Sequence, residues 1–250
     1  MTVVAPAFEV LRDREQVETA HRELLQRELV PPDRRERGPL MEGIVTRVAP
    51  ARASNLRPDS KKSWDVLRSI EAITARTGLD DPVLDMGSIG CAILPALHRL
   101  GYRRLAGIDL NAQIRHMPHQ GEIDYRVGDM TSTEWPDAHF AAITTISVIE
   151  HGVGDDALLA EVSRLLRPGG IFCFSTDFWP EKIDTSDTPL FGLPWRIFST
   201  PEIEALLESA GDHGLEPAGN LTGSIEATER PIHFADRDYT FLFGALVRAG

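Results

Sequence analysis

The hydrophobic and polar positions divide the chain into a helical start, an irregular connection and a long segment of alternating strands and helices. Between residues 8 and 29, apolar side chains recur at helical spacing and predict an amphipathic helix. The stripe consists of Val10, Val17, Ala20 and Leu24. Residues 31–62 are rich in Pro, Arg, Ser and Gly, which predicts an irregular connection. We therefore expect residues 1–62 to form an N-terminal extension whose helix packs on the main domain or, as a homodimer contact, on a second copy.

The segment from residue 63 to residue 250 alternates between short apolar runs and amphipathic stretches. The expected strands are 83–85, 105–109, 123–127, 140–148, 170–176, one near Leu215, and 239–247. The expected helices are 63–77, 91–100, 155–166 and 200–210. Such alternation is typical of a parallel sheet with helices on both faces. It predicts one Rossmann-like α/β domain over residues 63–250.

Two long connections interrupt this domain and predict lids over a cleft. The first, about 177–199, is dense in aromatic residues and prolines. Phe178, Trp179 and Trp195 would stack on a flat ring or a sugar face, and Asp177 would bind hydroxyls. A structural flap over the sheet edge is the alternative. The second connection, about 220–237, contains His233 and is expected to border the same cleft.

Charge and composition exclude several classes of protein. With 26 basic and 38 acidic side chains the formal net charge is −12, and an acidic body repels phosphate backbones, so nucleic acid is not an expected partner. No run approaches the about 20 apolar residues of a membrane helix, and the first residues do not read as a secretory signal. The two cysteines, Cys91 and Cys173, form neither a disulfide framework nor a four-cysteine zinc site. We expect a cytoplasmic protein without a membrane partner.

Candidate chemistry lies at the carboxyl ends of the expected strands, where parallel sheets bind ligands. After the first strand comes Asp85-Met86-Gly87-Ser88-Ile89-Gly90, a turn whose glycines let backbone approach a ligand. The second strand ends at Asp109, 24 residues after Asp85, where a carboxylate can accept both hydroxyls of a ribose. The third strand ends at Asp129-Met130, near where an adenine ring would lie. The alternatives are a packing turn, a helix cap and a simple turn residue.

These segments together resemble the class I S-adenosylmethionine (SAM)-dependent methyltransferases, over a stretch from about Ser63 to the C-terminus. The matching segments are VLDMGSIG, AGIDLN, VGDMTSTEWPDAHF, ITTISVIEHG and LLRPGGIFCFSTDFW. The resemblance implies a seven-stranded, mostly parallel sheet with an antiparallel last strand. It also implies SAM as the cofactor and S-adenosylhomocysteine as its product.

By the same resemblance, particular residues would hold the cofactor. Asp85 and Gly87 would lie against the methionine part, Asp109 would bind the ribose, and Ser147 would lie between cofactor and acceptor. The full set of expected cofactor-binding residues is Asp85, Gly87, Ser88, Gly90, Asp109, Leu110, Asp129, Met130 and Ser147. The first motif departs from the family's acidic-x-Gly-x-Gly-x-Gly, because Ile89 and Cys91 replace two glycines. A SAM-fold protein that binds partners without catalysis is therefore one alternative.

Glu150 and His151 are the expected catalytic residues, because they follow the fourth strand where the acceptor must arrive. His151 would act as general base, or the pair would only support the loop. Some quinone-pathway O-methyltransferases bind a divalent metal with an acidic-x-x-Glu-His pattern, but Ser147 holds the acidic position here. A metal is possible and not expected.

The acceptor is the least determined part of the prediction. TDFWPEKIDT and PWRIFSTPEIEALLESAGDHGLE resemble methyltransferases of bacterial polysaccharide and specialised-metabolite pathways. This implies methylation of a small molecule, at a hydroxyl of a sugar or metabolite. A nicotinamide-dependent dehydrogenase is the rival enzyme class, but the first turn lacks the G-x-G-x-x-G spacing.

Overall fold

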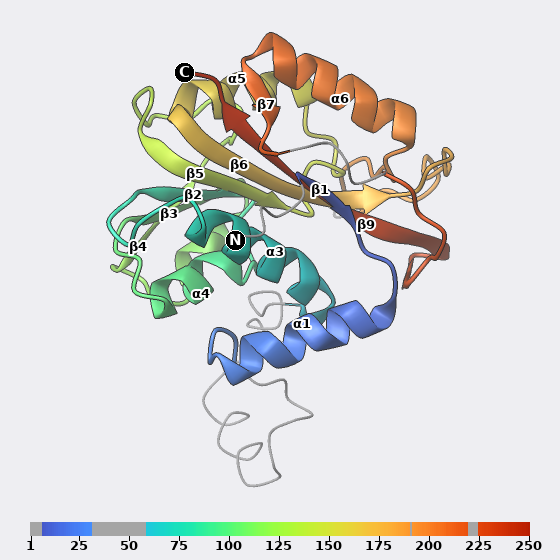
Figure 1. The fold of residues 1–250 in the computed structure, drawn as a ribbon, viewed down its shortest axis with the longest axis horizontal. Helices are drawn as coiled ribbons and strands as arrows, with labels where there is room; N and C mark the ends of the chain where they lie inside the picture. The colour runs from blue at the N-terminus through green and yellow to red at the C-terminus, as the bar shows by residue number, and fades with distance from the viewer. Residues whose placement is uncertain (1–6, 32–58, 191, 220–224) are drawn as a thin grey trace, which may run out of the picture.

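A mixed β-sheet runs through the middle of the molecule and carries helices on both faces (Figure 1). The computed structural model describes residues 7–31, 59–190, 192–219 and 225–250. Most of the predicted irregular connection and part of the second predicted lid, residues 220–224, lie outside the described residues.

Five parallel strands form the body of the sheet in the order β4-β3-β2-β5-β6. Their bounds are β2 (Val83–Met86), β3 (Leu105–Asp109), β4 (Ile123–Val127), β5 (Phe140–Ile146) and β6 (Leu166–Phe178). Every residue of β2 and β5 is buried, as expected for strands covered on both faces. The order reverses beside β2, and ligands bind at such a switch point in open α/β sheets.

The last strand, β9 (Arg237–Arg248), pairs antiparallel with β6, which confirms the predicted reversal. Three short strands also pair with β9: β7 (Leu215–Pro217), β1 (Phe8–Val10) and β8 (Ile232–Phe234). β1 completes the seven-strand path β1-β9-β6-β5-β2-β3-β4, and β7 and β8 lie off this path.

β1 corrects the expectation that the N-terminal helix begins at residue 8. Phe8 and Val10 are buried with a less buried residue between them, which is the period of a strand. The helix α1 (Arg14–Gln26) begins only after Asp13, whose side chain accepts a hydrogen bond from the Gln16 N–H and caps it.

Helices cover the two faces unequally. α5 (Asp155–Leu165) and α6 (Thr200–Asp212) cover one face, and α3 (Ser63–Thr74), α4 (Ile93–Arg99) and α1 cover the other (Figure 1). The short 3-10 helices η2 (Ser60–Lys62) and η3 (Ala112–His116) lie before α3 and after β3. Each face has its own apolar core. Among the described residues, none of the helices has the length and apolarity to cross a bilayer.

The apolar stripe of α1 packs against the α/β domain of its own chain. Ala20 and Leu24 are buried in the core that also contains Trp64 of α3, and His21 Nδ1 lies 2.9 Å from the Ser63 hydroxyl. Of the two packing partners predicted for this helix, the structure shows the main domain. A homodimer stays a prediction.

Candidate active site

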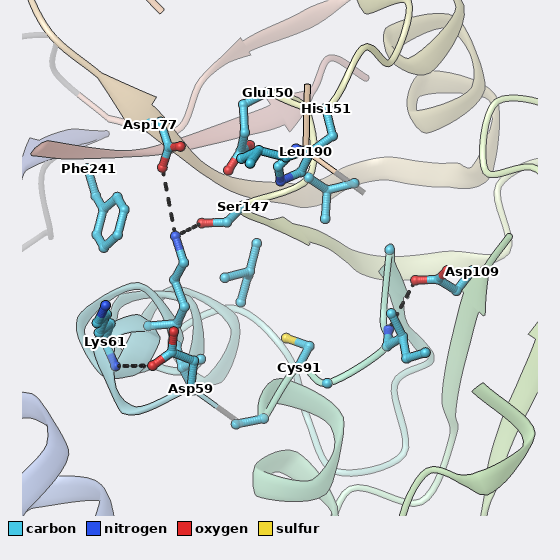
Figure 2. Close-up of a pocket in the computed structure, with 18 of the residues that line it drawn as sticks. Asp59, Lys61, Cys91, Asp109, Ser147, Glu150, His151, Asp177, Leu190 and Phe241 are labelled. Atoms are coloured by element: carbon cyan, nitrogen blue, oxygen red, sulfur yellow. Dashed lines mark hydrogen bonds and ion pairs between the residues drawn. The ribbon is translucent and has the colours of Figure 1, made fainter. Parts of the chain in front are cut away.

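A cavity of about 860 Å³ opens at the carboxyl ends of the parallel strands. Its lining comes from the turns after β2, β3, β4 and β5, from the end of β6, from β8 and β9, and from the residues around η2. Figure 2 shows Asp109 on one side of this space and Phe241 on the other, with Cys91 and Ser147 between them. Ten of the predicted site residues line it: Gly87, Gly90, Asp109, Leu110, Asp129, Met130, Ser147, Glu150, His151 and Asp177.

The turn after β2 carries glycine where the backbone needs it. Gly87 and Gly90 have φ of +76° and +71°, and a Cβ on Gly87 would lie 2.4 Å from a methyl of Val148. Neither Ile89 nor Cys91 is among the described residues with positive φ. The departure from the family's glycine pattern therefore imposes no backbone strain.

The rim formed by β3 and β4 presents carboxylates and one exposed apolar side chain. The Asp109 carboxylate accepts hydrogen bonds from the N–H groups of Ile89 (3.1 Å) and Asn111 (2.8 Å), which fix it at the cavity edge. Leu110 lines the cavity with 68% of its surface exposed. Asp129 accepts bonds from the N–H and hydroxyl of Thr131. Such a rim matches a nucleoside, which needs acceptors for its ribose and an apolar surface for its base.

Asp85 and Ser88 lie beneath the turn and do not line the cavity. Both are buried, and the Thr144 hydroxyl donates to Asp85 Oδ1 at 2.6 Å. Burial raises the pKa of Asp85 to about 7, against the lowering effect of the hydrogen bond from Thr144. In this structure Asp85 supports the turn from below.

Lys62, which the sequence analysis did not select, reaches into the opposite end of the cavity. Its ammonium donates to Ser147 Oγ at 2.5 Å, lies 3.8 Å from Asp177 Oδ1, and sits 3.7 Å from the centre of the Phe241 ring. The dashed lines from Ser147 and Asp177 in Figure 2 meet at this nitrogen. Ser147 has φ of +52°, a conformation uncommon outside glycine and often found at functional sites.

Three buried carboxyl groups surround this lysine. Burial raises the pKa of Asp65 to about 6, and the Lys62 charge opposes that rise. Burial also raises the pKa of Glu150, with a further contribution from the nearby charge of Asp177, and it raises the pKa of Asp177 itself. Hydrogen bonds hold these groups in place: Ser175 donates to Asp65, Thr176 to Glu150, and the Trp195 indole to Asp177.

His151 lines the cavity beside Glu150 and is neutral at neutral pH. Burial, and then the positive charge of Lys62, lower the pKa of His151 to about 4. A neutral imidazole can accept a proton, whereas a carboxyl group with a raised pKa tends to retain one.

The aromatic residues predicted to contact the acceptor lie elsewhere. Phe178, Trp179 and Trp195 are buried and do not line the cavity. Trp195 packs edge-on against Phe234 and Tyr239, so its ring belongs to the wall behind the cavity. His233 also does not line the cavity, and its Nδ1 lies 2.8 Å from Asp238 Oδ1. Among the described residues, the phenylalanine and tyrosine rings that do line it are Phe234, Tyr239 and Phe241.

A cap before α3 is a sequence signal for an ordered turn at Lys62, although it does not indicate which side chains Lys62 meets. The Asp59 side chain accepts a hydrogen bond from the Lys61 N–H, which starts η2 three residues before α3. Asp59 at the start of an amphipathic helix indicates an ordered turn, and Lys62 follows from that turn. Asp65 in the first turn of α3 carried no comparable signal, because acidic residues are common there.

The fold, with a cavity at the switch point of its sheet, is typical of α/β enzymes that bind nucleoside-containing cofactors. Comparisons with known proteins identify the class. The family model described as "Methyltransferase domain" matches residues 84–174, which run from Leu84 in β2 to Phe174 in β6.

Two relatives with similar sequences agree with this match. A Mycolicibacterium smegmatis protein named "probable S-adenosylmethionine-dependent methyltransferase" is 35% identical over 114 residues, which are 44% of this chain and 43% of that relative, less than half its length. A ubiquinone biosynthesis O-methyltransferase from Dinoroseobacter shibae is 30% identical over 173 residues, covering 62% of this chain and 68% of the relative. The chain belongs to the class I SAM-dependent methyltransferases, and SAM is its cofactor.

Solved structures show the same fold. The structure of geranyl diphosphate methyltransferase in complex with SAM superposes with a TM-score of 0.54 at 20% identity, covering 80% of this chain and 96% of the other. A SAM-dependent methyltransferase from Mesorhizobium loti gives a TM-score of 0.53 at 18% identity, covering 75% and 98%. The dehydrogenase alternative receives no support from these comparisons.

Proposed function

We propose that this chain transfers the methyl group of SAM to a hydroxyl oxygen of a small molecule, a sugar or a specialised metabolite. The observation that carries the proposal is His151, which lines the cavity beside Glu150 and is neutral at neutral pH. A volume of about 860 Å³ supports a small acceptor, since pockets of about 300–1,000 Å³ hold ligands of drug-like size. The D. shibae relative, whose name specifies O-methylation, supports oxygen as the methylated atom.

In this proposal, different parts of the cavity bind the cofactor and the acceptor. At the rim, Asp109 would bind the ribose, Leu110 and Met130 would pack on the adenine, and the Gly87 turn would let the backbone approach the methionine part. SAM would supply a methyl group bound to a positively charged sulfur. In an in-line displacement this methyl group passes to the acceptor, and the sulfur is the leaving group. The chain therefore has to align the acceptor and take its proton.

His151 is the proton acceptor in this proposal. It takes the hydroxyl proton as the acceptor oxygen forms its new bond to carbon, and the positive charge thereby moves from the cofactor to the imidazole. Glu150 next to it favours its protonated form and can donate a hydrogen bond to the acceptor. Lys62, Ser147 and Asp177 supply further polar groups for the remaining hydroxyls.

The arrangement around Ser147 also supports catalysis without a divalent metal. Metal-binding relatives of the kind described above need an acidic side chain at this position, and here a serine hydroxyl receives a hydrogen bond from the Lys62 ammonium. A divalent cation close to that ammonium would be repelled. We expect dialysis against a chelator to leave kcat at 25 °C within twofold of its starting value. Loss of activity, with recovery on adding Mg²⁺, would contradict this.

The acceptor can be found with SAM whose methyl group carries a stable isotope. The full chain would be incubated with hydroxylated sugars, phenols and metabolite extracts, and in parallel with matched amines and thiols, and the products located by mass spectrometry. We expect label on oxygen of small molecules. Label only on nitrogen, sulfur or a macromolecule would overturn the proposal. Asp109→Ala, with weakened SAM binding, is the negative control.

A further inference from the structure

Two histidines and a glutamate converge away from the cavity, on the α4 side of the sheet. His98 lies in the last turn of α4, and His119 and Glu122 lie in the connection between η3 and β4. His98 Nε2 and His119 Nδ1 each lie 3.4 Å from the same atom, Glu122 Oε2. One ligand atom from each of the three residues lies within 4.8 Å of the other two.

The distances suit metal ligands better than hydrogen-bonded pairs. Hydrogen bonds between nitrogen and oxygen are usually about 2.7–3.2 Å long. A tetrahedral zinc ion with bonds of about 2.0–2.1 Å instead separates its ligand atoms by about 3.3–3.4 Å. Both nitrogen-to-oxygen distances here are 3.4 Å. The His98 and His119 rings lie side by side, with centroids 4.2 Å apart and planes at 33°, so the two imidazoles reach Glu122 from neighbouring positions.

We propose that His98, His119 and Glu122 form a binding site for a tetrahedral transition-metal ion, with Zn²⁺ as the ion best matched to two imidazoles and one carboxylate. Water completes the coordination, because Glu122 is exposed and the two histidines are partly exposed. None of the three residues lines the cavity. The ion therefore serves the fold and takes no part in methyl transfer.

An ion at this site would connect two segments that flank the cofactor turn. α4 follows that turn directly, and the connection after η3 contains Met117, whose sulfur accepts a hydrogen bond from the Gly90 N–H at 3.3 Å. The Gln120 side chain donates to the Met117 carbonyl at 3.0 Å and fixes the connection internally. Cross-linking α4 to this connection would stabilise the folded state, since an ion that binds only the folded chain shifts the unfolding equilibrium.

The test is a Zn²⁺ titration of the metal-stripped full chain by calorimetry, with thermal unfolding measured alongside. We expect one ion per chain, and a rise in Tm of about 5–10 °C once free Zn²⁺ exceeds Kd about 100-fold. His98→Ala should weaken Zn²⁺ binding at least 30-fold. For the second ligand we choose His119→Asn, because His119 has φ of +64° and asparagine tolerates this conformation.

Two controls make the result decisive. His116→Ala changes an exposed histidine of the neighbouring η3 and should leave Zn²⁺ binding unchanged. SAM affinity within twofold of the parent chain shows that each variant is folded. Co²⁺ in place of Zn²⁺ should give the intense visible absorption of a tetrahedral ion. No stoichiometric Zn²⁺ binding, or the same affinity in the His98→Ala/His119→Asn double variant, would overturn the proposal.

Discussion

The two ends of the cavity are built in different ways. At the end proposed to bind the cofactor (the cofactor end), residues 87–131 supply the lining through turns that follow β2, β3 and β4, and the carboxylates of Asp109 and Asp129 lie at an accessible rim. At the end proposed to bind the acceptor (the acceptor end), η2, α3, β6 and the turn after β5 bring buried charges together around Lys62, whose ammonium also lies over Phe241 of β9.

The difference has an energetic consequence. Carboxylates at the rim keep water and backbone donors as partners, whereas the carboxyl groups around Lys62 are desolvated and have raised pKa values. We infer that the side chains of the cofactor end bind their ligand with little effect on the free energy of folding. At the acceptor end, the burial of charged groups is unfavourable for folding, and the rest of the fold has to offset it. Four substitutions test this contrast, from the largest expected effect to the smallest.

His151→Ala should lower kcat about 100-fold, because a positioned general base contributes about 10²–10⁴-fold to the rate. The Kd for SAM should stay within twofold, since the rim is untouched. Rapid-quench and steady-state assays with the identified acceptor measure the first quantity, and calorimetry the second. His139→Ala removes a histidine that does not line the cavity and serves as the matched control. Full activity of His151→Ala would remove the base assignment.

Asp65→Asn should stabilise the protein at pH 8 by roughly 2 kcal/mol. The pKa of Asp65 is about 6 when folded against 3.8 as its ordinary value, so the folded state binds the proton more tightly. Protonated Asp65 therefore contributes stability that is fully present below pH 3.8. As the pH rises through about 6 the proton is lost, and the free energy of unfolding falls by up to about 3 kcal/mol, at about 1.4 kcal/mol per pKa unit. The loss of a negative partner for Lys62 reduces the gain. Asparagine does not titrate and avoids the loss.

Urea unfolding of Asp65→Asn at pH 4.5 and pH 8 measures this effect, and the gain should be much smaller at pH 4.5. Asp129→Asn is the control from the other end of the cavity, because Asp129 is exposed and its oxygen can still accept from Thr131. We expect it to change stability by less than about 0.5 kcal/mol at either pH. Equal effects of the two substitutions on the free energy of unfolding would contradict the inference that only the acceptor end buries charge at a cost to stability.

The same contrast explains what the sequence could predict. Most strands of the sheet are visible as buried apolar runs, and Asp109 is found because it ends such a run. β4 is only partly buried, and Asp129 is found because it follows this strand after Gly128. Lys62 and Ser147 are 85 positions apart, and no local pattern indicates that their side chains meet. The sequence analysis does not predict β1 for a related reason. This strand has only three residues that pair with the distant strand β9, and the hydrophobic pattern of three residues is too short to distinguish a strand from a helix.

Asp109→Ala should weaken SAM binding by more than about tenfold, or about 1.4 kcal/mol, because a charged acceptor for the ribose hydroxyls is lost. Part of the loss comes from the Ile89 N–H, which also loses its partner. Asp124→Ala removes an exposed carboxylate of β4 that pairs with Arg126 away from the cavity, and it should leave SAM binding unchanged. Unchanged SAM affinity in Asp109→Ala would refute the ribose role.

The smallest expected effect separates aromatic residues that contact the acceptor from those that support the wall. Phe234 lines the cavity with 41% of its surface exposed, whereas Trp195 is buried behind it and donates to Asp177. An aromatic contact is worth about 0.5–1.5 kcal/mol, so Phe234→Leu should raise the KM for the acceptor about threefold. Trp195→Phe keeps a ring in the wall and should leave KM unchanged while lowering Tm, because Asp177 loses a buried donor. The reverse outcome, a raised KM only in Trp195→Phe, would mean that the predicted lid, about 177–199, opens to expose Trp195. The acceptor would then stack on Trp195, as the sequence predicted.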